Sequence, residues 1–317
     1  MKKHPTLPLQ ARRPHLSPLE TFGTDPGGLR ASTFVPKSFT ENGPLVVVLH
    51  GSSQSARSYD IGSGWSVLAE ELGVTLLFPR QRLANNSIGS FNWFMTSDSR
   101  RGKGEALSIR QMIRRVVKDH KVDPKRVFVT GLSSGGAMTS VMLATYPEVF
   151  AGGAIVAGLP YRSADNLTAA LFRMNGYGIP SDRRLSALVR GASKFTGPWP
   201  TISVWHGDSD TTVDQANAGA IVGQWQKLHK VEGPPTRIEK IDGAVRRVWC
   251  EPKGRAVIEE YIVAAMGHGM PINPRSAHGL GKEGKYMLDV GISSTRHIAA
   301  FWGLTPKVAP ARVNAGA

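Results

Sequence analysis

Residues 126–136 read Arg-Val-Phe-Val-Thr-Gly-Leu-Ser-Ser-Gly-Gly, in which a short apolar run passes directly into a turn rich in glycine and serine. A helical pattern follows over residues 135–146, and Pro147 prevents its extension. The pattern G-x-S-x-G, centred on Ser133, therefore lies between a strand and a helix, as an exposed serine nucleophile requires. The tight turn strains the serine backbone, so its neighbours two residues away must lack side chains. A glycine-rich turn without any chemistry is the alternative interpretation.

Further apolar runs and helical patterns alternate along the chain. The runs lie at residues 45–49, 74–78, 151–156, 201–205 and 257–263, and helical spacing recurs over 106–118 and 216–229. Runs of this length are typical of strands that are buried on both faces of a parallel sheet. We expect Pro79 to end the second run and residues 251–254 to form the turn of a hairpin. The alternation predicts an α/β fold with a doubly wound, mostly parallel sheet.

Composition divides the chain into stretches. Residues 1–30 are rich in Pro, Gly and Arg and are expected to form an irregular N-terminal segment, and residues 305–317 a flexible tail. Residues 31–304 are expected to form a single catalytic domain. Within it, residues 159–199 are punctuated by Gly and Pro, which predicts a cap or insertion over the carboxyl-terminal ends of the strands.

A nucleophilic serine needs a positioned base, and the base needs an acid that orients it. Behind a turn of this kind the acid comes next in the chain and the histidine last. Asp208 and Asp210 both follow a predicted strand, and either could be the acid, although Asp208 could also cap its turn. His268, in a glycine-rich loop after a later strand, is the preferred base, with His278 and His297 in reserve.

The reaction also needs backbone donors that bind a developing oxyanion. One should be the N–H of Ser134, directly after the nucleophile. The other should come from the loop after an early strand, where the chain reads His50-Gly51-Ser52. We expect the N–H of Ser52 to be this second donor, and an ordinary turn is the alternative.

Several motifs together carry a family resemblance. They are L-H-G at 49–51 with Gln54, N-W-F at 92–94, R-G-K-G-E at 101–105, T-G-L-S-S-G-G-A-M at 130–138 and V-W-H-G-D-S-D-T-T-V at 204–213. From about residue 30 to 275 the sequence resembles the poly(3-hydroxybutyrate) depolymerase-type esterases, relatives of the feruloyl and acetylxylan esterases. The resemblance implies an α/β-hydrolase fold, no cofactor and no metal. It also implies a triad of Ser133, Asp210 and His268.

The resemblance further suggests substrate contacts at Gln54, Trp93 and Tyr161. Trp93 would line the acyl cleft, with a core tryptophan as an equal alternative, and Tyr161 would border the same cleft. Family members often carry cysteines at the positions of Ser52 and Ser90. Their absence here fits a protein that matures where disulfides do not form.

Charge and cysteine content bear on compartment and partners. The formal charge is +15, but the basic residues are scattered and form no long run, so nucleic acid is not an expected partner. Cys250 is the single cysteine and permits no internal disulfide. With no signal-like N-terminus and no apolar run long enough to span a bilayer, a cytoplasmic protein is expected, and secretion is the alternative. The sequence does not indicate an oligomeric state.

These observations predict a serine carboxylesterase that works through an acyl-enzyme. Esters or oligomers of 3-hydroxyalkanoates, of the polyhydroxybutyrate type, are the first expected substrates. Feruloyl or acetyl esters of plant polysaccharides are the second. A non-catalytic binding module on a hydrolase scaffold is the alternative from another class.

Overall fold

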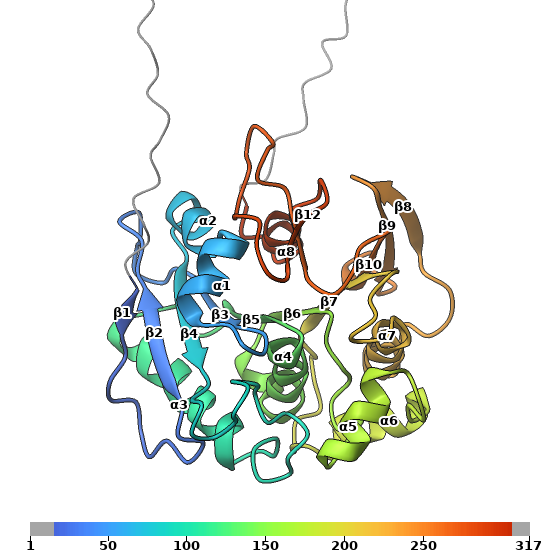
Figure 1. Ribbon diagram of the computed structural model, residues 1–317, viewed down its shortest axis with the longest axis horizontal. Helices are drawn as coiled ribbons and strands as arrows, with labels where there is room; N and C mark the ends of the chain where they lie inside the picture. The colour runs from blue at the N-terminus through green and yellow to red at the C-terminus, as the bar shows by residue number, and fades with distance from the viewer. Residues whose placement is uncertain (1–15, 306–317) are drawn as a thin grey trace, which may run out of the picture.

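Ten strands form one sheet in the order β1-β2-β4-β3-β5-β6-β7-β10-β9-β8 (Figure 1). A computed structural model describes residues 16–305. The strands are β1 (Ser17–Pro18), β2 (Arg30–Phe34), β3 (Leu45–Leu49), β4 (Thr75–Arg80), β5 (Val127–Leu132), β6 (Gly152–Val156), β7 (Thr201–Gly207), β8 (Arg237–Ile241), β9 (Ala244–Cys250) and β10 (Ala256–Val263). Strands β4, β3, β5, β6, β7 and β10, which are neighbours in the sheet in this order, are parallel. Antiparallel strands lie at both edges, β2 and β1 on one side and β9 and β8 on the other. The predicted mostly parallel sheet is confirmed.

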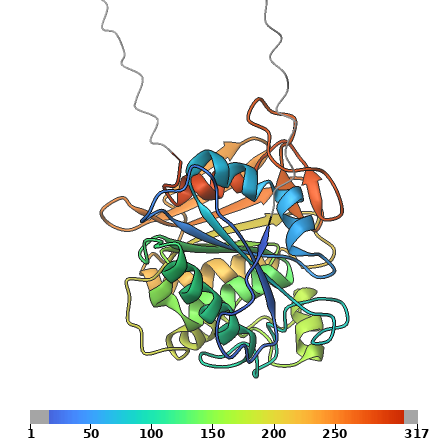
Figure 2. The same cartoon turned by 90° about the vertical axis from the view of Figure 1, so that its left-hand side faces the viewer.

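Helices cover both faces of this sheet (Figure 2). They are α1 (Ala56–Ser63), α2 (Trp65–Leu72), α3 (Gly104–Asp119), α4 (Ser134–Thr145), α5 (Leu167–Met174), α6 (Asp182–Arg190), α7 (Ala216–His229) and α8 (Ser294–Phe301). One hydrophobic core lies between the sheet and α3, α4 and α7, and a second lies between the sheet and α1, α2 and α8. Because both faces are covered, β3 and β5 are buried along their whole length, which explains their unbroken apolar sequences. The doubly wound α/β fold is therefore as predicted.

The expectation that Pro79 ends its strand is wrong. β4 continues through Pro79 to Arg80, and Pro79 lies opposite Ala31 of β2. Pairing of β4 with β3 has already stopped at Leu77. A proline is therefore tolerated here, because the missing N–H removes no bond to the parallel neighbour.

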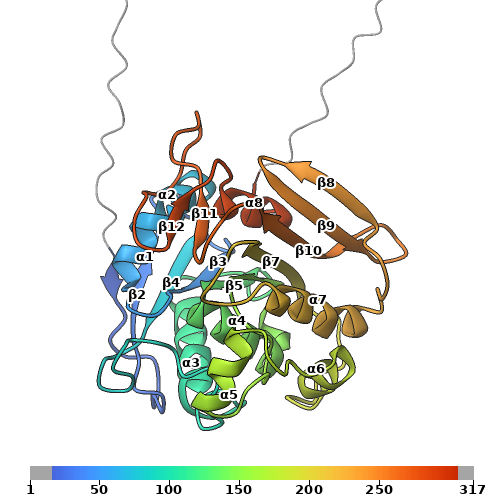
Figure 3. The same ribbon diagram turned by 45° about the vertical axis from the view of Figure 1, so that its right-hand side comes forward.

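The predicted hairpin around residues 251–254 is confirmed. β9 and β10 pair antiparallel, and the N–H of Glu251 donates to the carbonyl of Arg255 across the turn at 2.9 Å. β8 adds a further antiparallel strand, so that β10, β9 and β8 extend the sheet beyond β7 (Figure 3). β10 thus joins the hairpin to β7 and carries its own C-terminal loop beside the loop of β7.

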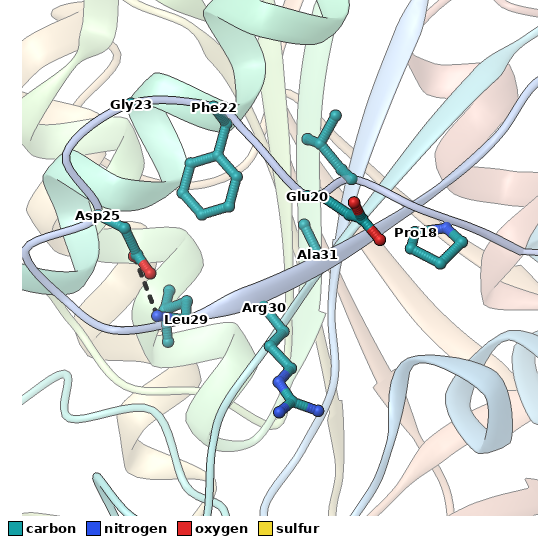
Figure 4. A pocket seen from close by; sticks show the side chains of 9 residues that line it. Pro18, Glu20, Phe22, Gly23, Asp25, Leu29, Arg30 and Ala31 are labelled. Atoms are coloured by element: carbon teal, nitrogen blue, oxygen red, sulfur yellow. Dashed lines mark hydrogen bonds between the residues drawn. The ribbon is translucent and has the colours of Figure 1, made fainter.

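The described part of the N-terminal segment, residues 16–29, contains one short strand, β1, and otherwise neither helix nor strand. Residues 1–15 lie outside the described residues, but β1 pairs with β2, and the loop between them docks on α3. The N–H of Gly27 donates to Ser108 Oγ at 2.8 Å. Phe22 and Leu29 help to line a hollow of about 390 Å³ under this loop (Figure 4). Short polar strands such as β1 carry no apolar run, so composition alone could not reveal this one.

The segment at residues 159–199 contains α5 and α6. α6 packs against α7 and α4, on one face of the sheet. α5 ends beside the loop that follows β7, because the N–H of Asp214 donates to the carbonyl of Met174 at 2.7 Å. Its role as a cap stays a prediction. The predicted tail at 305–317 lies, except for its first residue, outside the described residues.

No helix among residues 16–305 is long and apolar enough to cross a membrane.

A buried histidine should make stability depend on pH. His229 ends α7, its Nε2 lies 3.0 Å from the carbonyl of Pro200, and burial lowers its pKa from 6.5 to about 4. The unfolded chain therefore binds a proton between these two pH values that the native protein excludes. The free energy of unfolding should fall as pH is lowered through this window.

Urea unfolding of the wild type and of His229→Gln, measured from pH 4 to pH 8, tests this expectation. The variant should lose less stability than the wild type between pH 6.5 and 4, and above pH 7 the two should show the same pH dependence. If the free energy of unfolding fell equally in both proteins between pH 6.5 and 4, the lowered pKa of His229 would be contradicted.

Candidate active site

Ser133 occupies a strained turn between β5 and α4. Its backbone angles are φ 57° and ψ −118°, a region that residues with side chains rarely adopt. Such a conformation costs about 1–3 kcal/mol, and the surroundings must hold it in place. The N–H of Ser133 donates to the carbonyl of Val156 on β6 at 2.9 Å. The side chain is half-buried, at the carboxyl end of the sheet.

Two glycines make this turn possible. A Cβ on Gly131 would collide with the backbone carbonyl of Gly135, and a Cβ on Gly135 would collide with the carbonyl of Leu49. The turn therefore packs backbone against backbone, directly on the end of β3. This contact is the physical reason for both glycines of the G-x-S-x-G pattern.

The loops after β7 and β10 bring an acid and a histidine together. His268 Nδ1 lies 2.7 Å from Asp210 Oδ2. The other oxygen, Asp210 Oδ1, accepts the N–H groups of Thr212 at 2.8 Å and Val213 at 2.9 Å. The carboxylate is therefore fixed by its own loop and meets the ring of His268 with its free oxygen.

His206, near the end of β7, also contacts this carboxylate. Its Nε2 lies 2.7 Å from the carbonyl of Val213 and 3.3 Å from Asp210 Oδ2. Both neighbours are acceptors, so Nε2 carries the proton, and Nδ1 has no partner among the described residues. The i, i+4 spacing of His206 and Asp210 was the only sequence signal for this contact.

The pKa of Asp210 reflects these contacts. Burial alone would raise the pKa of the carboxyl, but hydrogen bonds from His206, His268 and the N–H of Val213 outweigh it and hold the pKa well below its usual value. Asp210 is therefore a carboxylate over the whole neutral range. The negative charge of Asp210 beside Nδ1 of His268 favours the tautomer that carries its proton on Nδ1. In this tautomer Nε2 is free to accept a proton.

Asp208, the competing acid, has a different position. Its Oδ1 accepts the N–H of Ala265 at 2.7 Å and the hydroxyl of Ser209 at 2.9 Å. The N–H of Ser209 in turn donates to the carbonyl of Met266 at 3.1 Å. Asp208 thus holds the loop that carries His268, while Asp210 contacts the ring itself.

The two reserve histidines lie elsewhere. His297 is on α8, where its ring lies beside Trp205 and its Nδ1 lies 3.3 Å from the hydroxyl of Tyr261. His278 is exposed, and its carbonyl accepts a bond from Arg296 Nε. Neither ring contacts Asp210.

Ser52 and Ser134 face each other across the turn. Their hydroxyl oxygens are 3.2 Å apart. Among residues 16–305, neither backbone N–H donates to a protein acceptor. Ser134 also begins α4, where the helix dipole favours negative charge. The two predicted oxyanion donors are therefore close together and unoccupied by protein groups.

His50 shapes the loop that carries Ser52. Its Nε2 accepts the N–H of Gln81 at 3.1 Å, so its Nδ1 carries the proton, 2.7 Å from the carbonyl of Gly51. Burial lowers the pKa of His50 to about 4, which keeps the ring neutral. The histidine of the L-H-G motif therefore positions the loop.

The three side chains predicted to contact substrate are bonded to or buried by other protein groups. Gln54 Oε1 accepts the N–H of Gly51 at 2.8 Å, which closes the loop around Ser52. Trp93 is only 4% exposed and packs edge-on against Phe94. Tyr161 is 3% exposed. Their contact with substrate stays a prediction.

Two motifs of the resemblance prove to be bound to each other. Glu105 is buried near the start of α3, and its carboxylate accepts the N–H and the side-chain amide of Asn92, each at 2.9 Å. It also accepts a bond from Gln81, which contacts His50. Glu105 thus anchors the N-W-F segment. The only indication of this in the sequence was that both motifs belong to the same family resemblance.

One ring near His268 lies beyond the resemblance. Tyr286 contacts the imidazole edge-on, with ring centroids 5.7 Å apart. The carbonyl of its neighbour Lys285 lies 3.5 Å from Gln54 Nε2. No sequence pattern singled out this segment.

A serine in a sharp turn after β5, an aspartate in the loop after β7 and a histidine in the loop after β10 are the arrangement of an α/β-hydrolase. Comparison with known proteins agrees. The family described as Esterase PHB depolymerase matches residues 30–235. A poly(3-hydroxyalkanoate) depolymerase C of Paucimonas lemoignei is 42% identical over 291 residues, which cover 91% of this chain and 70% of that protein. The chain therefore belongs to the Esterase PHB depolymerase family and is a carboxylic ester hydrolase.

Other relatives extend the likeness. An acetylxylan esterase of Coprinopsis cinerea is 29% identical over 81% of this chain and 69% of that protein. A feruloyl esterase B of Talaromyces funiculosus is 26% identical over 81% of this chain and 73% of that protein. The acetyl xylan esterase structure from Aspergillus awamori has a TM-score of 0.78 at 22% identity, covering 92% of this chain and all of that one, which shows the shared fold.

The close packing at the elbow predicts the effect of a single methyl group. Gly135→Ala should lower the free energy of unfolding by about 2–3 kcal/mol, because the new Cβ displaces the end of β3. It should also lower esterase activity, since Ser133 and Ser52 would move apart.

Gly219→Ala on α7 is the matched control. Nothing lies within 4 Å of a Cβ there, and alanine should raise stability by about 0.5–1 kcal/mol. Chemical unfolding and p-nitrophenyl ester turnover measure both effects. Equal stability of the two variants would disprove the packing argument.

Proposed function

We propose that the chain hydrolyses esters of 3-hydroxyalkanoates through a triad of Ser133, His268 and Asp210. His268 Nε2 takes the proton from Ser133 Oγ as this oxygen attacks the ester carbonyl. Asp210 stabilises the imidazolium that forms. The same proton then passes to the departing alcohol, and water repeats the sequence to release the acid from Ser133.

The contact between Asp210 and His268 carries this proposal. A buried carboxylate at 2.7 Å from Nδ1 is the arrangement that turns an imidazole into a base for a nearby hydroxyl. The strained backbone of Ser133 and the unoccupied N–H groups of Ser52 and Ser134 support the other two functions, attack and oxyanion binding.

The proposed substrate class rests on the relatives. The 42% identical protein is named a poly(3-hydroxyalkanoate) depolymerase, whereas the acetylxylan and feruloyl esterases are 29% and 26% identical. We therefore place hydroxyalkanoate esters and oligomers first, with acetyl or feruloyl esters of polysaccharides as the alternative. A cytoplasmic site of action stays a prediction from the single cysteine, Cys250, with secretion as its alternative.

Substitution of the nucleophile tests the reaction. Ser133→Ala should lower kcat for a p-nitrophenyl acyl ester by at least about 10³-fold and abolish labelling by a fluorophosphonate. A non-catalytic binding module would show no labelling in the wild type either. Wild-type turnover by Ser133→Ala would contradict the mechanism.

Substitution of Asp210 and of Asp208 should affect kcat very differently. Asp210→Asn should lower kcat by about 10⁴-fold, because an amide favours the wrong tautomer of the histidine. Asp208→Asn keeps an oxygen for the N–H of Ala265 and should lower kcat by no more than about tenfold. The reverse order would make Asp208 the catalytic acid.

A panel of esters tests the substrate class. The ratio kcat/KM should be higher for hydroxybutyrate trimers than for methyl ferulate or an acetylated xylo-oligosaccharide. The result would point to the polysaccharide esters if methyl ferulate or the acetylated sugar were preferred.

A further inference from the structure

A basic hollow lies beside the loop that carries Ser52. It has a volume of about 460 Å³ and is lined on one side by Ser53, Gln54 and Ser55. Three arginines, Arg30, Arg80 and Arg82, line it as well; we call these six residues and the space between them the arginine pocket. No acidic side chain lines it.

The three arginines lie close together although their like charges repel one another. Arg30 on β2 and Arg80 on β4 are direct cross-strand partners, and like charges opposite each other destabilise a sheet. Among residues 16–305, none of the three arginines forms an ion pair with a carboxylate. Figure 4 shows the Arg30 side chain extending away from Glu20 and Asp25, the acids of the neighbouring hollow. An anion in the pocket would relieve this repulsion.

The pocket is built onto the loop of Ser52. The N–H of Ser53 donates to the carbonyl of Ile88 at 2.8 Å, which ties the loop after Arg82 to the loop of Ser52. Ser53 directly follows Ser52 in the chain, and Ser55 is at most about 11 Å from it along the backbone. An anion held here would therefore lie within reach of a substrate whose carbonyl sits at Ser52.

We propose that the arginine pocket binds the free carboxylate at the end of a hydroxyalkanoate oligomer. This inference rests on the proposed function. In such an oligomer the carboxyl end belongs to the fragment that leaves as the alcohol when the ester is cut. Hydrolysis adds water across the scissile bond, so the pocket would retain a hydroxy-acid anion while the acyl fragment stays on Ser133.

Guanidinium groups suit this ligand. They stay charged at all relevant pH values and can bind both oxygens of a carboxylate with paired hydrogen bonds. The carboxylate does not change during the reaction, so the pocket binds substrate and transition state equally. Its loss should therefore raise KM and leave kcat nearly the same.

The test compares a hydroxybutyrate trimer as the free acid with the methyl ester of the same trimer. For the wild type at low salt, kcat/KM should be about tenfold higher for the free acid, mainly through KM. Added salt should reduce the preference, because Arg30 and Arg82 are exposed and Arg80 is half-buried. In Arg82→Gln and in Arg30→Gln the ratio of the two kcat/KM values should fall toward one. The methyl ester, measured on the same samples, reports whether each variant is folded.

Arg237→Gln is the matched control, because Arg237 is exposed on β8, at the other edge of the sheet, and forms no ion pair with a carboxylate of residues 16–305. It should keep the wild-type preference. Equal turnover of acid and methyl ester by the wild type would overturn the inference, as would a loss of preference in Arg237→Gln as large as in Arg82→Gln. Failure of the wild type to hydrolyse either trimer would instead contradict the proposed function.

Discussion

The backbone of residues 131–135 packs directly against the carbonyl groups that end β3, and no side chain fits between them. This contact holds Ser133 in a backbone conformation that is unfavourable in isolation. The same carbonyl groups lie just before the loop that carries Ser52. One close approach of the turn at Ser133 to the end of β3 therefore sets both the position of Ser133 and the positions of the Ser52 and Ser134 N–H groups relative to it.

The order of the strands does the rest. β5, β6, β7 and β10 are consecutive neighbours in the sheet, so their carboxyl ends form one edge. The acid and the histidine come from adjacent strands, β7 and β10, which explains how residues 58 apart in the chain come within 2.7 Å. The strands from which these loops start are buried between the two cores, so packing in the cores fixes where each loop begins.

The central strands could be predicted from sequence because burial on both faces demands unbroken apolar runs, as in residues 45–49. The edges could not. β2 alternates exposed and buried residues over five positions, and Pro79 looks like a strand terminator until its partner strand is known. The turn at Ser133 and the pairing of Asp210 with His268 were likewise predicted, whereas the contact of His206 with Asp210 depends on the fold of the loop.

The two aspartates after β7 show why one motif contains two acids. Asp210 is buried and must be matched by donors, which it finds in two imidazole rings and two backbone N–H groups. Such a carboxylate cannot also hold the neighbouring loop, because its oxygens are already engaged. Asp208, one turn earlier and exposed, does so through Ala265. Asp210 therefore contacts the ring of His268, and Asp208 holds the loop that carries this histidine, so each carboxylate has its own structural role.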